Sequence, residues 1–488
     1  HLNSKILSSK IMSKNISDFT QMTIKENLEF LNKLEDPTAK YIIDPLKKQL
    51  EALEYIGLSY LTLNRVTTTL SGGEAQRLKL IRHLNSSLSD LVYIIDEPSV
   101  GLHPEDIAKI NEILKSLKEK GNTVLIVEHD PDVIKEGDYI IDMGPGSGKN
   151  GGEITFEGTY NELLSSNTST GNALRNKHNL KENIREANHF YNIGPVTQNN
   201  LNNVKTSIPK HVLTVLTGVA GSGKSTLVKA GFENNDHTIF IDQKAVQGSN
   251  RSNLLTYLGV FDSVRSFFSK ETGLNKAMFS YNSKGACPNC GGKGYIKTEL
   301  AFMGDFSQTC EVCHGKRYKQ EVLDATIDGY SIADVLDLTV DEGIIFFDKK
   351  NDIKSKLQSV SKTGLNYMSL GQPLSTLSGG EIQRVKLGQH LDEEIKNSIF
   401  IFDEPTTGLH ESDIPILMEC FDDLIDQNNT VILIEHNLSI MCEADWIIDV
   451  GPGPGLDGGK VQFSGTPKNF IDSSETLTSK HLKRYINQ

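Results

Sequence analysis

Short apolar runs of strand length alternate along this chain with amphipathic stretches of helical length. Two runs, 91–95 and 123–127, lie in the first part of the chain, and two more, 399–402 and 430–434, lie in the last part. Each run has the length and composition of a buried strand. The stretch 106–118, between the first two runs, has the length and pattern of an amphipathic helix. The order strand, helix, strand predicts α/β units with a parallel sheet.

The first and last parts of the chain are copies of one another. Their motifs recur at a constant spacing of 307 residues over about a hundred positions without a net insertion, which indicates an internal repeat. The recurring motifs are Gly57-Leu58 with Gly364-Leu365, Leu70 to Glu74 with Leu377 to Glu381, Asp96-Glu97-Pro98 with Asp403-Glu404-Pro405, Glu128-His129 with Glu435-His436, Gly144-Pro145-Gly146 with Gly451-Pro452-Gly453, and Gly158-Thr159 with Gly465-Thr466.

The repeat divides the chain into two units, which we call copy one (1–164) and copy two (187–488). The segment 165–186 is rich in Ser, Asn, Thr and charge, and is predicted to be the linker. Copy two opens with an apolar run at 212–217 that leads into a glycine-rich turn. Copy one has no counterpart of this opening, so we expect an incomplete first unit. The chain begins at His1 rather than Met, and we expect it to be the C-terminal portion of a longer protein.

The glycine-rich turn of copy two fits the phosphate-binding loop G-x-x-x-x-G-K-[ST]. Its glycines allow backbone N–H groups to turn towards phosphate oxygens. Lys224 supplies a cation for the β- and γ-phosphates, Ser225 can bind magnesium, and a helix beginning near Lys224 adds the positive end of its dipole. The predicted ATP-binding residues of this loop are Gly218, Gly221, Ser222, Gly223, Lys224, Ser225 and Thr226.

Two carboxylates, Asp403 and Glu404, follow the run 399–402. Asp403 is suited to hold magnesium, and Glu404 to polarise an attacking water. Taken alone, such a pair is more often a polar strand end without a role. Its position after a phosphate loop, with His436 at the end of the next strand, favours a catalytic site in which His436 senses the γ-phosphate. Gln243, after the predicted strand 238–241, is placed to touch the metal and the water.

Each copy also contains Leu-Ser-Gly-Gly-Glu followed by Gln and Arg, the signature of ABC ATPases. A helix N-terminus preceded by these small residues can close on the γ-phosphate of a nucleotide held by the opposite cassette, so a signature acts in trans. The first signature therefore completes a site with the loop of copy two. The second site has Glu97 and His129 but no phosphate loop. The predicted signature residues are Ser71, Gly72, Gly73, Ser378, Gly379 and Gly380.

Four cysteines form two Cys-x-x-Cys pairs, Cys287 with Cys290 and Cys310 with Cys313, separated by 19 residues. This spacing is typical of a tetrahedral zinc site, and the glycines after each pair provide tight turns. Two disulfides or a redox pair are the alternative. We expect a zinc module over 270–320, followed by an α-helical signature domain over 321–395, both inserted in copy two. Cys420 and Cys442 lie in apolar surroundings and are expected to be buried thiols.

The formal charge of −13 argues against extensive coating of nucleic acid. Between Lys244 and Gln320, however, 11 Lys and Arg stand against 5 Asp and Glu. Four bound thiolates with one zinc ion lower this surplus to about +4. The local excess indicates either a DNA-binding patch or a solvated basic face. The candidate DNA contacts are Arg251, Lys293, Lys316 and Arg317.

Together these motifs resemble the UvrA family, the ATPase subunit of bacterial nucleotide-excision repair, including its shorter UvrA-like paralogues. The motifs that carry the resemblance are Thr69-Leu-Ser-Gly-Gly-Glu-Ala-Gln-Arg77, Asp96-Glu-Pro-Ser-Val-Gly-Leu-His103, Thr217-Gly-Val-Ala-Gly-Ser-Gly-Lys-Ser225, Cys310-Glu-Val-Cys-His-Gly-Lys-Arg-Tyr318 and Asp403-Glu-Pro-Thr-Thr-Gly-Leu-His410. The resemblance implies two ABC cassettes of the P-loop NTPase fold with helical signature domains, ATP-gated dimerisation, and double-stranded DNA bound across a homodimer. The sequence 244–251 departs from the proline-containing, arginine-bearing run common in the family, which favours a divergent paralogue.

The leading functional hypothesis is a cytoplasmic ATPase that uses ATP, magnesium and zinc to recognise DNA damage, without a nuclease activity of its own. The resemblance implies contact with a UvrB-like partner only through a region upstream of His1. The alternative is a short UvrA-like ATPase that gives drug or DNA-damage tolerance without UvrB. A translation-associated twin-cassette protein and a transporter subunit are disfavoured by the four cysteines. No run reaches the roughly 18 apolar residues of a membrane-spanning helix.

Overall fold

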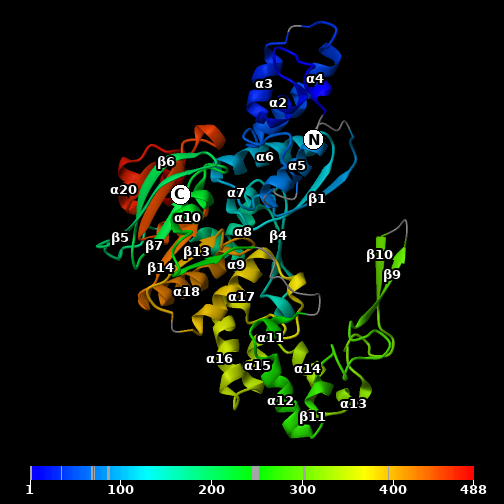
Figure 1. The fold of residues 1–488 in the computed structure, drawn as a ribbon. Helices are drawn as coiled ribbons and strands as arrows, with labels where there is room; N and C mark the ends of the chain where they lie inside the picture. Colours follow the sequence, from blue (N-terminus) through cyan, green and yellow to red (C-terminus); the bar gives the residue numbers. More distant parts are fainter. Residues whose placement is uncertain are drawn as a thin grey trace.

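The computed structural model describes residues 3–34, 36–67, 70, 72–84, 88–176, 179–243, 252–300, 304–393 and 395–487. The two copies lie against each other, and a helical region and a long hairpin of copy two extend away from them (Figure 1). Within the described residues, no helix is both long and apolar enough to cross a membrane.

Copy two contains a six-stranded sheet in the order β16-β15-β7-β14-β13-β8. Neighbouring strands are parallel except for β16, which runs antiparallel to β15. The apolar runs predicted as strands are therefore confirmed in copy two, and so is the parallel sheet. The strand bounds are β7 Leu213–Thr217, β8 Thr238–Ile241, β13 Ile399–Asp403, β14 Thr430–Ile434, β15 Trp446–Gly451 and β16 Lys460–Gly465.

Both faces of this sheet are covered by other elements. Successive side chains of a strand point to opposite faces, so each strand contributes to two cores. Ile399 and Ile401 pack in one core with the antiparallel strands β5 (Phe190–Gln198) and β6 (Leu201–Pro209) and with α10. Phe400 and Phe402 pack on the other face against α18 and α19. The helices of this part are α10 Lys224–Phe232, α18 Ile414–Asp426, α19 Leu438–Glu443, α20 Pro467–Ser473 and α21 Leu477–Ile486.

The helical region of copy two has a separate hydrophobic core. This core also includes α11 and α12, which precede the cysteines in the chain. The antiparallel hairpin β9–β10 stands away from the helices (Figure 1). The elements are α11 Leu254–Tyr257, α12 Phe261–Thr272, β9 Tyr295–Leu300, β10 Gly304–Thr309, α13 Gln320–Leu323, β11 Thr326–Ile327, β12 Tyr330–Ser331, α14 Ile332–Asp337, α15 Val340–Phe346, α16 Asn351–Val360 and α17 Gly379–Leu391.

Copy one has the same order of elements over the repeated positions. Strands β1 and β2 form a parallel pair, and β3 and β4 an antiparallel pair. The predicted helix is α6, which packs on β1 and β2. The elements are α1 Ser4–Leu7, α2 Ile16–Gln21, α3 Ile24–Asn32, α4 Lys40–Tyr55, α5 Gly72–Leu84, β1 Val92–Asp96, α6 Pro104–Glu119, β2 Thr123–Val127, α7 Pro131–Ile134, β3 Ile140–Gly144, β4 Glu153–Gly158 and α8 Tyr160–Leu164.

The expectation that β1 and β2 are buried strands is wrong for one face of the pair. Val92 and Ile94 are 62% and 75% exposed, and Leu125 and Val127 are 50% and 53% exposed. Their repeat counterparts in β13 and β14 are buried against β5, β6 and α10. The described part of copy one has no counterpart of those covering elements, so this apolar face meets solvent.

The segment predicted as the linker contains a helix, α9 (Ser169–Arg175), followed by an extended stretch. The stretch is held on copy two by ion pairs. Lys181 Nζ lies 3.5 Å from Asp445 Oδ1, and Arg185 Nη1 lies 2.8 Å from Asp422 Oδ1. Buried Asp445 thus attaches the connection to the sheet.

Candidate nucleotide site and metal centre

The phosphate loop joins the end of β7 to the start of α10, which begins at Lys224 as expected. Gly218, Gly221 and Gly223 all have positive φ angles, of 130°, 73° and 103°. A Cβ added at Gly218 would lie 1.9 Å from the carbonyl oxygen of Val450, so only glycine fits there. The Lys224 ammonium donates to the carbonyl oxygens of Gly218 and Val219, at 2.8 and 3.0 Å. The loop therefore encloses a buried cation at a helix N-terminus, which suits an anionic ligand.

The residues predicted to bind magnesium lie beside one another. The Ser225 hydroxyl is 3.3 Å from Asp403 Oδ1, although these atoms come from α10 and β13. Lys229 Nζ lies 3.4 Å from the other oxygen of Asp403. A hydroxyl and a carboxylate are oxygen ligands of the kind that magnesium prefers.

Glu404 directly follows β13 and adopts a positive φ of 53°. Burial, together with the neighbouring carboxylates Asp403 and Glu435, raises the pKa of Glu404 to about 7. Gln243 donates its side-chain N–H to the carbonyl oxygen of Glu404 at 3.1 Å. His436 is buried, and this burial holds the pKa of its imidazole well below the ordinary value. The structure therefore brings Gln243, Asp403, Glu404 and His436 to the end of the sheet that carries the phosphate loop.

The equivalent residues of copy one also meet. His129 Nε2 lies 3.6 Å from Glu97 Oε1, and burial raises the pKa of Glu97. Glu97 has a φ of 43°, close to that of its counterpart Glu404. No phosphate loop faces this pair within the described residues of copy one, as the sequence predicts.

The two signature helices begin at the first glycine of each signature, Gly72 for α5 and Gly379 for α17, and not after the glycines as expected. Ser378 caps α17 and forms a reciprocal capping box with Glu381. A Cβ at Gly380 would come within 2.2 Å of the Thr407 carbonyl oxygen, so the helix start lies close to the loop after β13. Ser71 lies outside the described residues.

The Gly-Leu-His turn of each copy, 101–103 in copy one and 408–410 in copy two, reaches the catalytic candidates of the other copy. A Cβ at Gly101 would lie 2.7 Å from Glu404 Oε2, and a Cβ at Gly408 would lie 3.5 Å from Glu97 Oε1. His103 stacks edge-on against His436, and His410 does so against His129, with ring centroids 5.9 and 6.1 Å apart. A cavity of about 170 Å³ lies between the copies and is lined by Glu97 and His129 of copy one and by Glu404 and His436 of copy two.

Sequence analysis missed these cross-contacts of the Gly-Leu-His turn. The turn could have been singled out from the sequence, because it recurs in both copies shortly after the two carboxylates.

Burial and the nearby His481 imidazole lower the pKa of His103 to about 3. The ring accepts from the Glu105 N–H through Nδ1, which leaves Nε2 as the donor to the Thr478 hydroxyl at 3.0 Å. Neutral His103 therefore connects copy one to α21 of copy two.

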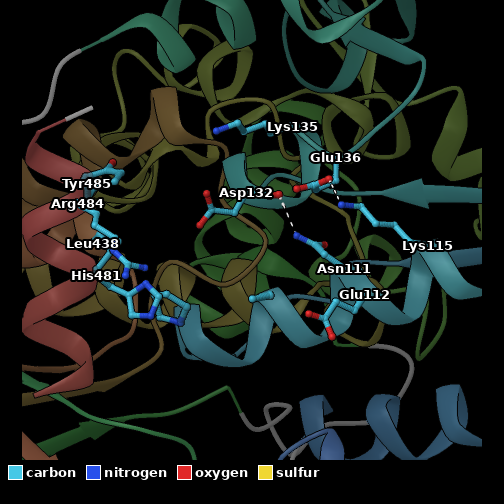
Figure 2. A pocket seen from close by; sticks show the side chains of 12 residues that line it. Asn111, Glu112, Lys115, Asp132, Lys135, Glu136, Leu438, His481, Arg484 and Tyr485 are labelled. Carbon is cyan, nitrogen blue, oxygen red and sulfur yellow. Dashed lines mark hydrogen bonds and ion pairs between the residues drawn. The ribbon is translucent and has the colours of Figure 1, made fainter.

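A larger cavity, of about 380 Å³, lies between α6 and α21 (Figure 2). Two of its charged side chains, Lys115 and Glu136, form an ion pair. Lys115 lies 2.5 Å from Glu136, and Asn111 donates to the carbonyl oxygen of Asp132 at 3.0 Å. None of the predicted phosphate-binding or catalytic residues is among the residues that line it.

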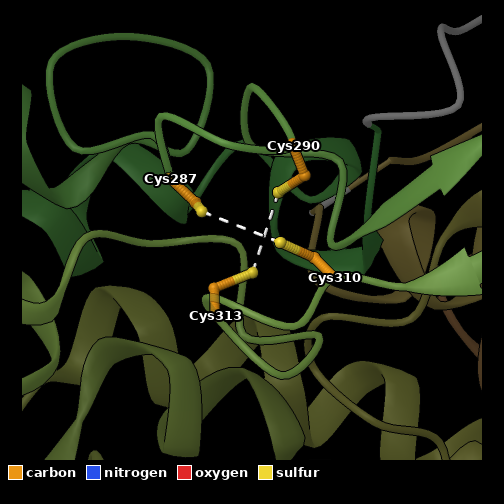
Figure 3. A group of neighbouring side chains, drawn as sticks. All are labelled: Cys287, Cys290, Cys310 and Cys313. Carbon is orange, nitrogen blue, oxygen red and sulfur yellow. Dashed lines mark hydrogen bonds between the residues drawn. The ribbon is translucent and has the colours of Figure 1, made fainter.

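The four predicted zinc ligands converge on one point (Figure 3). Their sulfur atoms all lie within 4.8 Å of one another, and all four residues are buried. The Sγ atoms of Cys287 and Cys310 are 4.0 Å apart, and those of Cys290 and Cys313 are 3.7 Å apart. Tetrahedral zinc with bonds of about 2.3 Å needs sulfur atoms about 3.8 Å apart, whereas a disulfide needs about 2.05 Å. All four cysteines are free thiols in the structure, so the geometry fits a metal site and not two disulfides.

Hydrogen bonds favour the thiolate form of Cys310, whereas burial raises the pKa of the Cys313 thiol to about 12. The Gly294 N–H donates to Cys290 Sγ, and the Asn289 amide donates to Cys310 Sγ at 3.3 Å. Backbone N–H of Cys313 and the Asn289 amide lower the pKa of the Cys310 thiol to about 6. Thiolates are the form in which cysteine binds metals. The other two cysteines, Cys420 and Cys442, are buried free thiols, as expected.

The comparisons with known proteins agree with this geometry. A protein-family model described as "ABC transporter" matches residues 201–407. UvrABC system protein A of Clostridium perfringens is 42% identical, over 99% of this chain and 56% of that protein. The corresponding protein of Bacillus subtilis is 40% identical, over 99% of this chain and 55% of that protein. The crystal structure of UvrA2 from Deinococcus radiodurans superposes with a TM-score of 0.93 at 37% identity, over 99% of this chain and 65% of that chain.

The chain is therefore UvrA-like. Its fold is that of the ABC ATPases. The UvrA-like chain spans a little over half the length of the two UvrABC system proteins named above. A chain of the ribosome-bound archaeal Pelota and ABCE1 superposes with a TM-score of 0.53 at 18% identity, over 92% of this chain and 63% of that chain, which is a likeness of fold alone.

Three of the four basic candidates of the UvrA-like chain lie close to the cysteines in the sequence. Lys293 is exposed, whereas Lys316 forms a 2.9 Å ion pair with Asp334. The guanidinium of Arg317 lies over the Tyr281 ring, 5.3 Å from its centroid. Arg251 lies outside the described residues. Part of the predicted positive charge is thus neutralised by an ion pair or packed on an aromatic ring of the protein itself.

Proposed function

We propose that this UvrA-like chain binds and hydrolyses ATP and uses this cycle to recognise damaged double-stranded DNA. The observation that carries the proposal is the assembly, in copy two, of the buried Lys224 loop with Asp403, Glu404 and His436. The 42% identity to a protein named for the UvrABC system supports the link to DNA repair. The same proposal includes a homodimer, a UvrB-like partner and a cytoplasmic location.

In this proposal the backbone of the phosphate loop and Lys224 hold the β- and γ-phosphates, and Ser225 and Asp403 hold magnesium. Magnesium neutralises charge that develops on the phosphates. Glu404 accepts a proton from the attacking water, and His436 contacts the γ-phosphate. The signature helix of copy one, α5, closes the site in trans. Gly101, from the same copy, keeps the Glu404 carboxylate in place.

The shifted pKa values predict a narrow pH optimum for kcat/KM with ATP. Activity should rise through about pH 7, because Glu404 must lose its proton to act as a base. Activity should fall above about pH 8, because burial lowers the pKa of Lys224 to about 8 and the uncharged amine attracts phosphate less. Steady-state rates between about pH 6 and pH 9 test this expectation. In Glu404→Gln, ATP binding should keep the alkaline limb, and a flat profile in the wild-type chain would contradict both assignments.

The four thiols fit zinc, so the cysteine cluster is proposed to be a structural zinc module that supports the DNA-binding surface. Zinc supplies no redox chemistry there and holds the two glycine-rich turns together.

The DNA-binding part of the proposal predicts a modest, sequence-independent affinity that falls with salt. Reversing the charge of Lys293, Lys316 and Arg317 together should weaken binding to any duplex and flatten the log–log salt dependence, because fewer phosphate contacts release counterions. Fluorescence anisotropy with intact and ultraviolet-damaged duplexes, in the presence of ATP, measures both effects. The matched control reverses three exposed lysines on the sheet and its flanking elements, Lys205, Lys460 and Lys468.

The control variant should bind DNA like the wild-type chain. Equal losses in the two triple variants would mean that net charge alone, and not the cysteine module, governs DNA binding. Damage recognition further requires that the wild-type chain bind the damaged duplex more tightly than the intact one, and equal affinities would exclude it.

A further inference from the structure

Tyr60 of copy one lies directly on the phosphate loop of copy two. A Cβ added at Gly221 would come within 2.9 Å of Tyr60 Cε1 and 3.0 Å of its Cζ. A Cβ at Gly455 would come within 2.7 Å of Tyr60 Cβ. The two glycines are themselves joined, since the Gly455 N–H donates to the Gly221 carbonyl oxygen at 3.0 Å. The tyrosine ring therefore packs on the backbone of the loop and of the corner that supports it.

The other end of Tyr60 is tied to the signature helix of its own copy. Its hydroxyl donates to Glu74 Oε1 at 2.5 Å, and Glu74 is a buried residue in the first turn of α5. Arg65 Nη2 lies 3.5 Å from the second oxygen of Glu74. Burial and the Glu74 carboxylate raise the pKa of Tyr60 above its ordinary value, so the hydroxyl stays a donor at neutral pH. One side chain thus connects the loop to the start of the signature helix.

The repeat provides the same tyrosine in copy two, with a different neighbour. Tyr367 donates to Glu381 Oε1 at 2.8 Å, as Tyr60 does to Glu74. A Cβ at Gly148, the counterpart of Gly455, would come within 3.1 Å of Tyr367 Cβ. Within the described residues, copy one has no phosphate loop for Tyr367 to contact. The tyrosine–glutamate bond is therefore common to both copies, and the contact with a phosphate loop is found at Tyr60.

We propose that Tyr60 is a positioning residue that acts in trans. Its ring packs on the phosphate loop of copy two and fixes the position of that loop, and its hydroxyl holds the first turn of the signature helix α5 beside it. The inference rests on the proposed ATPase function. A phosphate loop alone holds a diphosphate, whereas the signature helix acts on the γ-phosphate. Tyr60 therefore increases the affinity for a nucleoside triphosphate and the rate of its hydrolysis, and leaves the affinity for a diphosphate unchanged.

Tyr60→Phe tests this role, because it keeps the ring on Gly221 and removes the bond to Glu74. A hydrogen bond to a charged group corresponds to a change of about ten-fold or more in an equilibrium. We expect kcat for ATP to fall about ten-fold and affinity for a non-hydrolysable ATP analogue to fall towards that for ADP. ADP affinity should stay within about two-fold of wild type. Tyr367→Phe removes the same kind of bond and is the matched control, with turnover close to wild type.

Equal effects of the two substitutions, whether large or negligible, would overturn the proposal, because a merely structural bond would act alike in both copies. A loss of ADP affinity in Tyr60→Phe as large as the loss of analogue affinity would also overturn it. If the wild-type chain binds nucleotide without turnover, the proposed hydrolysis fails. The ratio of analogue to ADP affinity then still decides the role of Tyr60.

Discussion

Glu404→Gln is expected to abolish ATP turnover while ATP binding persists. Glu404 is buried beside Asp403 at the end of β13, close to the phosphate loop, and is placed to take a proton from water. Removing a positioned general base lowers the rate by about 10² to 10⁴. Glu97→Gln is the matched control, because Glu97 has the same backbone conformation but no phosphate loop within the described part of its copy. Steady-state hydrolysis and equilibrium ATP binding of both variants separate catalysis from binding.

A second pair of variants tests how the copies share this site. Gly101 and Gly408 have φ angles of 67° and 66°, so alanine strains both backbones alike. Only at Gly101 would the new methyl group clash with the carboxylate of Glu404. Gly101→Ala should therefore lower turnover and Gly408→Ala should change it little. For the two glutamate variants of the first prediction, activity that survives Glu404→Gln but is lost in Glu97→Gln would reverse the assignment of the hydrolytic site.

Loss of zinc is expected to unfold the cysteine module. Four thiolates around one zinc ion contribute on the order of 10 kcal/mol to the folding of small metal-stabilised modules. Cys310→Ser removes a ligand that the Asn289 amide orients. The purified variant should contain less than one zinc ion per chain, and its hairpin β9–β10 should become sensitive to protease.

Cys420→Ser is the control for zinc loss, since Cys420 is a buried thiol outside the cluster. This variant should keep the full zinc content, although burying a hydroxyl lowers the overall stability somewhat. Wild-type protein purified under reducing conditions without bound zinc would refute the zinc assignment, whatever the behaviour of the variants.

The sequence alone determined the elements and the chemistry that depend on local order. The strands at 123–127, 238–241 and 430–434 have the predicted bounds, because an uninterrupted apolar run between turn residues leaves few alternatives. The helix that begins at Lys224 follows from the glycine-rich turn before it. The Cys-x-x-Cys pairs likewise meet as expected, since each pair forms one turn and only two turns must be brought together.

Only the tertiary structure decided which surfaces are covered and which residues of one copy reach the other. Val92 and Ile94 have the same apolar character as Ile399 and Ile401, yet they are exposed, because burial depends on the elements packed above a strand. The position of Tyr60 on Gly221 joins residues 161 positions apart in the chain. A local pattern carries no information about such contacts, which arise from the packing of one copy on the other.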